Sequence, residues 1–589
     1  MGERGPEQNG PFRSMTATTH PLAAAPLRVR TMDEAGLVTW ASLGILVLLL
    51  AWPLGYAVWA VFADAESGLA SLARAAENGS IGRVIWNTTW VVLGSTAVAV
   101  AIGSVFAWVN ERTDAHLPGF GDLLPLAPLL VPPIAGVMGW AILLDPRVGL
   151  ANIQIRRLLD LFGIEMRVGP FNIYTGWGLI LVTALFLVPY VYLLVSAALR
   201  RLDPALEEAS RVGGAGPMRT LVRITLPSVT PAIVAAALLS IVGALGLFSV
   251  PVVIGTAARI DVLSVYLFRL FESYPPQTAL ALVLAAGMVA TVQALLIIQR
   301  LMTRGGRHAT VGGRGFRGTR VRLGPFRHVV RAVALVYLAA TALAPLVGLV
   351  IVSTQSFWTP IINWSRASLV NYRAVLFENA GTQGAFVNSL AQGAAVATVA
   401  MLLGALVVLR TRNGSPLAGR LADAVTTLPA VLPHTVVGIA FLLAFGPAPF
   451  RLYGTAAILF LAYLAMAMPY AGQAAIAAAG SIGRELGEAS RVAGADAGRT
   501  FRRILLPVAL PGLAAGWAMI FIHTAGEVSA SALLAGTNNP VIGRVMMDLW
   551  AFGSYPQVAA LAVLMAVVNG VMIAMVLRFG KRAAGGGAA

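Results

Sequence analysis

Two ionisable residues near the end of the chain, His523 and Glu527, stand in an otherwise apolar stretch. Because they are four residues apart, they share one face of a helix. Ionisable side chains at membrane depth are commonly functional, so this pair either contacts a cation or polar solute or only hydrogen-bonds within a helical bundle. Two ligands are too few for a stable metal site. The sequence therefore predicts candidate solute-contacting residues, but no resident metal and no catalytic residue.

A polar motif occurs twice, 280 residues apart. Both copies read Glu-Ala-Ser, three residues, Gly, nine residues, Ile, one residue, Leu-Pro. Before the first copy, Asp203-Pro204 supplies an N-cap and a first helical residue, and Gly213-Gly214 supplies a left-handed end to a short helix. The motif thus predicts a helix-turn-helix element joined at both ends to longer helices. Its shared positions are Glu208, Ala209, Ser210, Gly214, Ile224 and Pro227, and Glu488, Ala489, Ser490, Gly494, Ile504 and Pro507.

Long apolar segments fill most of the 589 residues, of which 58% are hydrophobic and 11% charged. Apolar segments of about 18 residues or more indicate membrane-spanning helices, whose backbone groups are satisfied within the segment. The sequence therefore predicts an all-α polytopic membrane protein with about 12 transmembrane helices in two homologous six-helix halves. The predicted spans are 37–62, 84–109, 122–144, 176–199, 228–250, 278–299, 329–353, 385–409, 423–446, 453–475, 508–526 and 557–579.

The net charge of +17 comes mainly from arginines in the loops between apolar segments. This distribution indicates orientation in a membrane by the positive-inside rule and not nucleic-acid binding. Residues 300–328 hold eight arginines and no acidic residue, so we expect this link in the cytoplasm. Counting spans outward from it places both termini and both motif loops there as well. The absence of cysteine excludes disulfides and thiolate metal sites.

The repeat extends beyond the motif, since Asn87 opens the second predicted span as Asn388 opens the eighth, and Pro132-Pro133 matches Leu432-Pro433. Each half has an even number of spans, so we expect a pseudo-twofold axis along the membrane normal with the pathway between the halves. The first half carries about 20 extra residues, which fall in the predicted external loop 145–175. The predicted divisions are a cytoplasmic disordered tail (1–36), a first half (37–299), a basic cytoplasmic linker (300–328), a second half (329–582) and a flexible tail (583–589).

The paired motif resembles the "EAA" loops of permease subunits in bacterial ATP-binding-cassette (ABC) importers, although Ser210 and Ser490 replace the second Ala of that pattern. The resemblance implies the type I ABC importer permease fold, in the bacterial inner membrane, with one chain forming the whole pore. It also implies two partners: two copies of a cytoplasmic ABC ATPase, which uses ATP and Mg, and an external solute-binding protein. The sequence has no Gly-x-x-x-x-Gly-Lys-Ser/Thr phosphate loop, so we expect no ATPase site and no bound cofactor in this chain.

Within that family, the stretches 147–152, 171–174, 248–256 and 310–316 resemble the fused ferric iron permeases. This resemblance implies ferric iron as the solute, while permeases for thiamine, polyamines or phosphonates share the architecture. A secondary transporter with two six-span halves is the alternative class, but the paired loops have no role in that mechanism.

Two further features point to the ends of the spans. Glu272 precedes the sixth predicted span, near its external end, where it either meets a binding protein or gates the pathway. The arginine-rich link 300–328 is an orientation signal that also attracts anionic membrane lipid.

Overall fold

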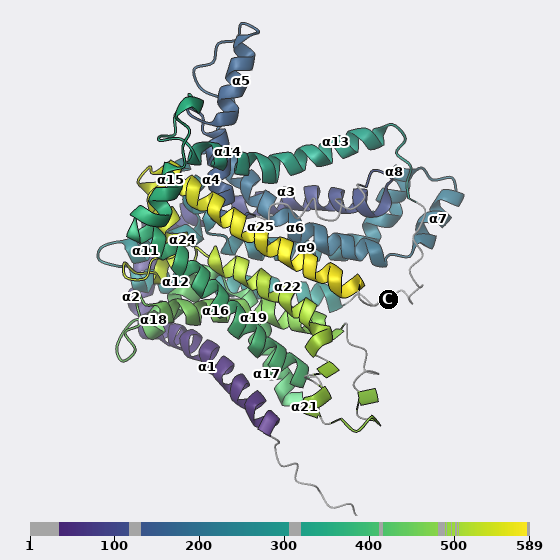
Figure 1. Ribbon diagram of the computed structural model, residues 1–589, viewed down its shortest axis with the longest axis vertical. Helices are drawn as coiled ribbons and strands as arrows, with labels where there is room; N and C mark the ends of the chain where they lie inside the picture. Colours follow the sequence, from purple (N-terminus) through teal and green to yellow (C-terminus); the bar gives the residue numbers. More distant parts are fainter. Residues whose placement is uncertain are drawn as a thin grey trace, which may run out of the picture.

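A computed structural model describes residues 34–116, 131–304, 320–411, 416–480, 489–490, 492–495, 497–500, 503–504 and 506–585. Within these ranges, ten helices are long and apolar enough to cross a membrane, and they run side by side across Figure 1. The predicted all-α polytopic fold is confirmed. The ten are α1 (Glu34–Ala63), α3 (Ser80–Arg112), α6 (Gly176–Arg201), α8 to α9 (Pro217–Gly246), α12 (Thr278–Arg304), α13 to α14 (Phe326–Ser353), α16 (Ala380–Thr411), α19 (Ala456–Gly480), α22 (Leu506–Ala525) and α25 (Tyr555–Gly585).

The ninth predicted span, 423–446, is not one straight helix. It is divided between α17 (Pro416–Thr427) with the short turn Leu428–Val431 and α18 (His434–Phe445), which meet at a bend of 109°. The prediction of a continuous span is wrong here because Pro433 lacks a backbone N–H and forces Leu432 into an extended conformation, with ψ at 127°. The repeat partner of this break lies in the third predicted span, 122–144, of which residues 117–130 are outside the described ranges. The described remainder is α4 (Pro133–Leu144).

Several shorter helices in the described ranges were not predicted, among them α5 (Leu150–Asp160) in the predicted external loop 145–175. Helix α2 (Ala65–Glu77) packs on α12. A second bent pair joins the segment Pro251–Ala258 to α11 (Leu263–Glu272) at 85°, broken where Arg259 has a positive φ of 57°. Helix α24 (Ile542–Ala551) is the repeat partner of α11 in the second half.

The two halves repeat the same packing. Helices α3, α6 and α9 (Leu226–Gly246) contact one another in the first half, as α16, α19 and α22 do in the second. Small and β-branched residues let these helices approach closely; a Cβ on Gly103 would meet Val191 at 2.8 Å, and one on Gly404 would meet Ala471 at 2.9 Å. Close approach of small residues is the usual basis of helix association in lipid.

The first helix of each half crosses to the other half. Helix α1 packs on α17 and α18, and α14 (Ala344–Ser353) packs on α4 as well as on α25. In Figure 1, α1 lies along the lower edge beside α18, and α14 lies near α4 at the upper edge. The exchange is reciprocal, so each half contributes one helix to the outer wall of its partner.

The repeated asparagines tie the second and eighth spans to the helices at the left of Figure 1. Asn87 Nδ2 donates to the Asp261 carbonyl at 3.2 Å, and Asn388 Nδ2 donates to the Pro540 carbonyl at 3.0 Å. The next residue in each case, Thr88 or Ser389, accepts from the first backbone N–H of α11 or α24, at 2.8 Å in both. These hydrogen bonds satisfy helix N-termini that lack intrahelical partners.

Candidate coupling loops and solute pathway

The first motif forms a helix-turn-helix loop at the right-hand end of the bundle in Figure 1. The loop comprises α7 (Pro204–Val212) and α8 (Pro217–Thr220), followed by a π-helical turn, Leu221–Thr225, that leads into α9. The predicted N-cap is confirmed, because the Asp203 carboxylate accepts from the Ala205 N–H at 2.9 Å. Gly214, but not Gly213, has the predicted left-handed conformation, with φ at 79°.

The second motif repeats this turn wherever it is described. Gly494 also has φ at 79°, and α21 (Ala497–Thr500) follows it at the same end of the bundle (Figure 1). In both copies the residue after the glycine donates its N–H to the motif serine carbonyl at 3.1 Å, from Ala215 to Ser210 and from Ala495 to Ser490. The predicted residue Glu488 lies outside the described residues.

A side-chain hydrogen bond that was not predicted closes each loop. The Ser210 and Thr220 hydroxyls lie 3.0 Å apart, and the Ser490 and Thr500 hydroxyls 2.8 Å apart. The serines that depart from the family pattern therefore have a structural partner. Ser-x₉-Thr recurs at matching positions in both copies of the sequence, and this spacing is the signal that was available.

Glu207, beside the motif residue Glu208, anchors the first loop to the bundle. Its carboxylate lies 3.4 Å from Arg112 Nε at the end of α3 and accepts from the Thr225 hydroxyl at 2.6 Å. Both charged side chains are nearly buried, at 9% and 11% exposed. Arg112 also donates to the carbonyls of Leu199 and Leu202 after α6. One buried ion pair thus joins the loop to α3, α6 and the start of α9.

The outer surface of each loop is apolar at one matching position. Val212 is 91% exposed and Val492 is 89% exposed. Of the other predicted positions, Glu208, Ala209, Gly214 and Pro227 are exposed, whereas Ser490 is buried. Ile224 and Ile504 are half-buried. Exposed apolar side chains rimmed by polar residues mark protein contact surfaces.

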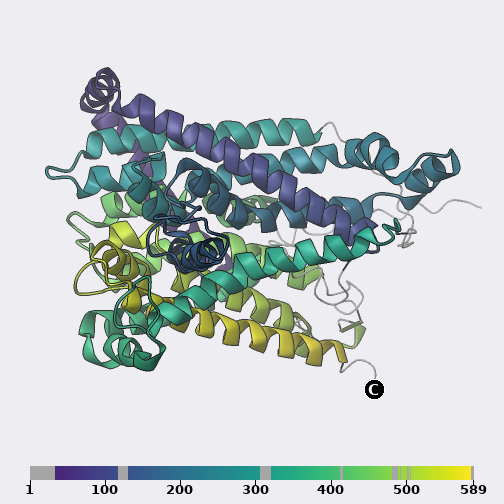
Figure 2. The same ribbon diagram turned by 90° about the horizontal axis from the view of Figure 1, so that it is seen from above.

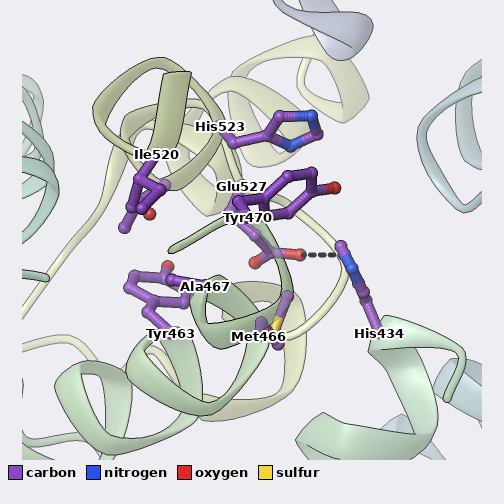
Figure 3. Close-up of a pocket in the computed structure, with 9 residues that line it drawn as sticks. His434, Tyr463, Met466, Ala467, Tyr470, Ile520, His523 and Glu527 are labelled. Carbon is purple, nitrogen blue, oxygen red and sulfur yellow. Dashed lines mark ion pairs between the residues drawn. The ribbon is translucent and has the colours of Figure 1, made fainter. Parts of the chain in front are cut away.

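A pocket inside the second half brings together two of the predicted solute-contacting residues with residues that were not predicted (Figure 3). His523 stacks on Tyr470, with ring centroids 4.9 Å apart, and His434 Nδ1 lies 3.8 Å from a Glu527 carboxylate oxygen. His434 is the first residue of α18, directly after the break at Pro433. Because the break was not predicted, His434 was not predicted as a site residue either. The pocket's free volume of about 20 Å³ has room for a water molecule only.

Glu527 has a structural role as well. Its carboxylate accepts from the backbone N–H groups of Ala530 and Ser531, at 3.0 to 3.1 Å, where the short helix Ser531–Leu534 (α23) follows α22. It is therefore a cap that also faces His434.

Glu272 lies outside this pocket. It pairs with Arg544 of α24 at 2.9 Å and so links the last residue of α11 in the first half to the second half. Burial alone would lower the pKa of Arg544, but the carboxylates of Asp548 and Glu272 raise it, so the guanidinium stays charged.

The pocket is lined by second-half residues and lies beside contacts between the two halves. A Cβ on Gly246, at the end of α9, would come within 3.6 Å of Pro433, and one on Gly526, just after α22, within 3.3 Å of Pro132. The two glycines occupy matching positions in the repeat, and the two prolines belong to the matching pairs Pro132-Pro133 and Leu432-Pro433. The pocket itself is asymmetric, because His434, His523 and Glu527 correspond to Ile134, Gly243 and Leu247, whereas Tyr470 corresponds to Tyr190.

A duplicated helical bundle with a matching loop at the same end of each half defines the class of polytopic transporter permeases. A family model described as "binding-protein-dependent transport system inner membrane component" matches residues 99–305 and 397–585, one match in each half, and the chain belongs to this family. It is a multi-pass inner-membrane protein. Within its transporter it is the permease component, and the permease is not the catalytic component.

Three relatives are similar over most of the chain. The ferric transport system permease of Actinobacillus pleuropneumoniae is 24% identical over 96% of this chain and 81% of its own length. A putative ferric transport system permease of Haemophilus influenzae is 24% identical over 88% and 81%. A probable ABC transporter permease of Sinorhizobium fredii is 26% identical over 92% and 94%. The resemblance to fused ABC importer permeases is confirmed.

Proposed function

We propose that this chain forms the translocation pathway of an ATP-driven importer for ferric iron. An external solute-binding protein delivers the iron, and two copies of a cytoplasmic ABC ATPase, which bind the ATP and Mg, drive its transfer. The observation that carries the proposal is the pair of loops of the same geometry at one end of the bundle, each with an exposed valine at its tip.

The loops suit the transmission of force. The Ser–Thr hydrogen bond makes each loop a compact unit, and the Arg112–Glu207 pair joins the first loop to α3, α6 and α9. An ATPase that moves Val212 and its neighbours therefore moves three spans together. Because the second loop has the same turn, two ATPase copies would engage the two halves alike. In this proposal both loops and both termini lie in the cytoplasm.

The pathway in this proposal runs between the halves, past Tyr190 and Tyr470. These tyrosines occupy matching positions after a proline within α6 and α19, and Tyr190 is 44% exposed. His434 and His523 add a polar wall on the second half only, while Glu272 and Arg544 close the opposite end from the loops. At this pocket the free volume of about 20 Å³ admits no more than a water molecule.

Ferric iron is proposed because two relatives that match most of the chain are named as ferric transport permeases. The pocket offers imidazole and phenol groups, and imidazole is a suitable iron ligand. Among the described residues, no cluster of three or more His, Cys, Asp or Glu side chains is arranged to hold a metal ion. Weak, dispersed contacts favour passage because a solute that binds tightly does not leave.

The test is transport by the purified components. Proteoliposomes that contain this chain and its ATPase are supplied with the binding protein and radiolabelled ferric iron. Uptake is expected only when ATP is present on the side of the membrane that holds the ATPase and the binding protein is present on the opposite side. A binding protein that purifies with an organic amine or a phosphonate would overturn the iron assignment, and uptake without the ATPase would overturn the ABC mechanism.

A further inference from the structure

The first half carries an arm that the second half lacks. The arm, residues 145–171, joins α4 to α6 and is built around α5 (Leu150–Asp160). The corresponding connection in the second half, between α18 and α19, covers only residues 446–455. Helix α5 projects from the side of the bundle across the direction of the long helices, lengthwise at the top of Figure 1 and end-on in Figure 2.

The arm is held in a defined conformation by hydrogen bonds of its own. Asn152 Nδ2 donates to the carbonyls of Asp145 and Phe171, at 2.9 and 2.7 Å, and its Oδ1 accepts from the Phe171 N–H. Arg156 donates to the carbonyls of Arg147 and Arg167, at 3.1 and 3.0 Å. These bonds fasten the returning chain to α5, so the tip is held away from the bundle.

The tip of the arm exposes large apolar side chains with nothing packed over them. Leu161 is 81% exposed and Phe162 is 74% exposed, and Leu158 and Ile164 are more than half exposed. The same segment carries four exposed charged residues, the basic Arg157 and Arg167 and the acidic Asp160 and Glu165, so charged groups flank the apolar side chains of the tip. An apolar cluster of this kind on a fixed arm indicates a surface that a partner covers.

The position of the arm indicates the partner. The arm leaves the bundle between the end of α4 and the start of α6, where Trp177 is 77% exposed, and Trp86 in the neighbouring α3 is 67% exposed. Exposed tryptophans near span ends mark the boundary between lipid and water. Because the arm extends sideways at this boundary, its apolar tip lies over lipid and not over the mouth of the pathway.

We infer that residues 145–171 are an interfacial anchor whose tip inserts into the lipid leaflet at the end of the bundle opposite the coupling loops. Leu161 and Phe162 contact the acyl chains, and Arg157 and Arg167 contact lipid phosphates, as in other amphipathic interfacial elements. With the orientation proposed above, this is the outer leaflet. The anchor would brace the first half against the bilayer while the loops move.

Site-directed spin labelling tests this inference, and the absence of cysteine in the chain makes every introduced cysteine unique. The full chain carrying Phe162→Cys is labelled in nanodiscs of phosphatidylethanolamine and phosphatidylglycerol. The matched control is Tyr274→Cys, which is 100% exposed in the hairpin between α11 and α12 at the same end of the bundle. Label exposure is measured with oxygen, which partitions into lipid, and with a nickel chelate, which stays in water.

The ratio of oxygen to nickel accessibility at position 162 is expected to exceed that at position 274 several-fold. Equal nickel accessibility at the two positions would overturn the inference. Nickel exposure at position 162 that falls only when the binding protein is added would also overturn it and would assign the arm to that protein. If Phe162→Cys does not elute as a monodisperse protein, Leu158→Cys provides the same readout.

Discussion

At the scale of single residues, the two buried charges Arg112 and Glu207 carry the clearest structural role. Removing one partner of a buried ion pair leaves the other charge without compensation. The neighbouring motif residue, Glu208, is exposed. A change at Glu207 should therefore affect stability, whereas a change at Glu208 should affect coupling to the ATPase.

We predict that Glu207→Gln lowers the stability of the purified protein by about 1–3 kcal/mol, because the Arg112 guanidinium loses its counter-charge. The measurement is the midpoint of thermal unfolding in detergent. The matched variant Glu208→Gln should keep the wild-type midpoint and reduce ATP-driven transport instead. Equal midpoints for the two variants would contradict the anchoring role of Glu207.

A second residue-scale prediction concerns the asymmetric pocket. His434→Ile introduces the residue that the first half has at the matching position, Ile134. We expect roughly tenfold slower ferric iron uptake, as for a loss of about 1.4 kcal/mol of favourable contact. The ATPase activity of the assembled complex should persist, because the coupling loops are untouched. Thr435→Val is the control, and unchanged uptake by His434→Ile would remove this residue from the pathway.

At the scale of elements, the coupling loops depend on one backbone conformation. Gly214 and Gly494 both have φ at 79°, which Pro cannot adopt and Asn tolerates. The capping residues of α7, Asp203 at its start and Gly213 at its end, have ordinary conformations. The left-handed glycine thus fixes the direction in which α8 leaves the turn.

We predict that Gly214→Pro abolishes transport while the protein remains in the membrane, whereas Gly214→Asn retains most of it. The measurement is ATP-dependent uptake alongside the amount of protein in isolated membranes. Normal uptake by the proline variant would show that the geometry of the loop is not required. The same pair of changes at Gly494 should behave alike if both loops couple.

The elements also show what the sequence predicted and what it could not. Apolar length predicted ten spans correctly, because this signal is local. The bend at Pro433 was missed because apolar composition continues through it, and only the backbone records a turn of 109°. The left-handed turn at Gly214 was predicted from residue type. The Glu207–Arg112 pair was not, since its partners are 95 residues apart.

At the scale of the whole molecule, the halves are held together by exchanged helices and by contacts at the breaks. Helix α1 covers α17 and α18 of the second half and packs less extensively on α12 of its own half. The Glu272–Arg544 bridge adds little by comparison, because the two side chains are 46% and 28% exposed. Exposed ion pairs of this kind contribute about 0–1 kcal/mol.

We predict that deletion of residues 1–63 destabilises mainly the second half, because it uncovers the faces of α17 and α18. Limited proteolysis should then cut the second half first. Glu272→Gln, in contrast, should shift the unfolding midpoint only slightly. Preferential cleavage of the first half after the deletion would contradict the exchanged arrangement.

The central claim is that both loops dock on the ATPase, and cysteine cross-linking at the loop tips tests it most directly. Val212→Cys and Val492→Cys are each the single cysteine of their chain and are each nearly fully exposed. With the partner ATPase present, each variant should form a cross-link to one ATPase copy, and the double variant should link two. If neither position cross-links in a preparation that transports ferric iron, the loops are not the coupling surface.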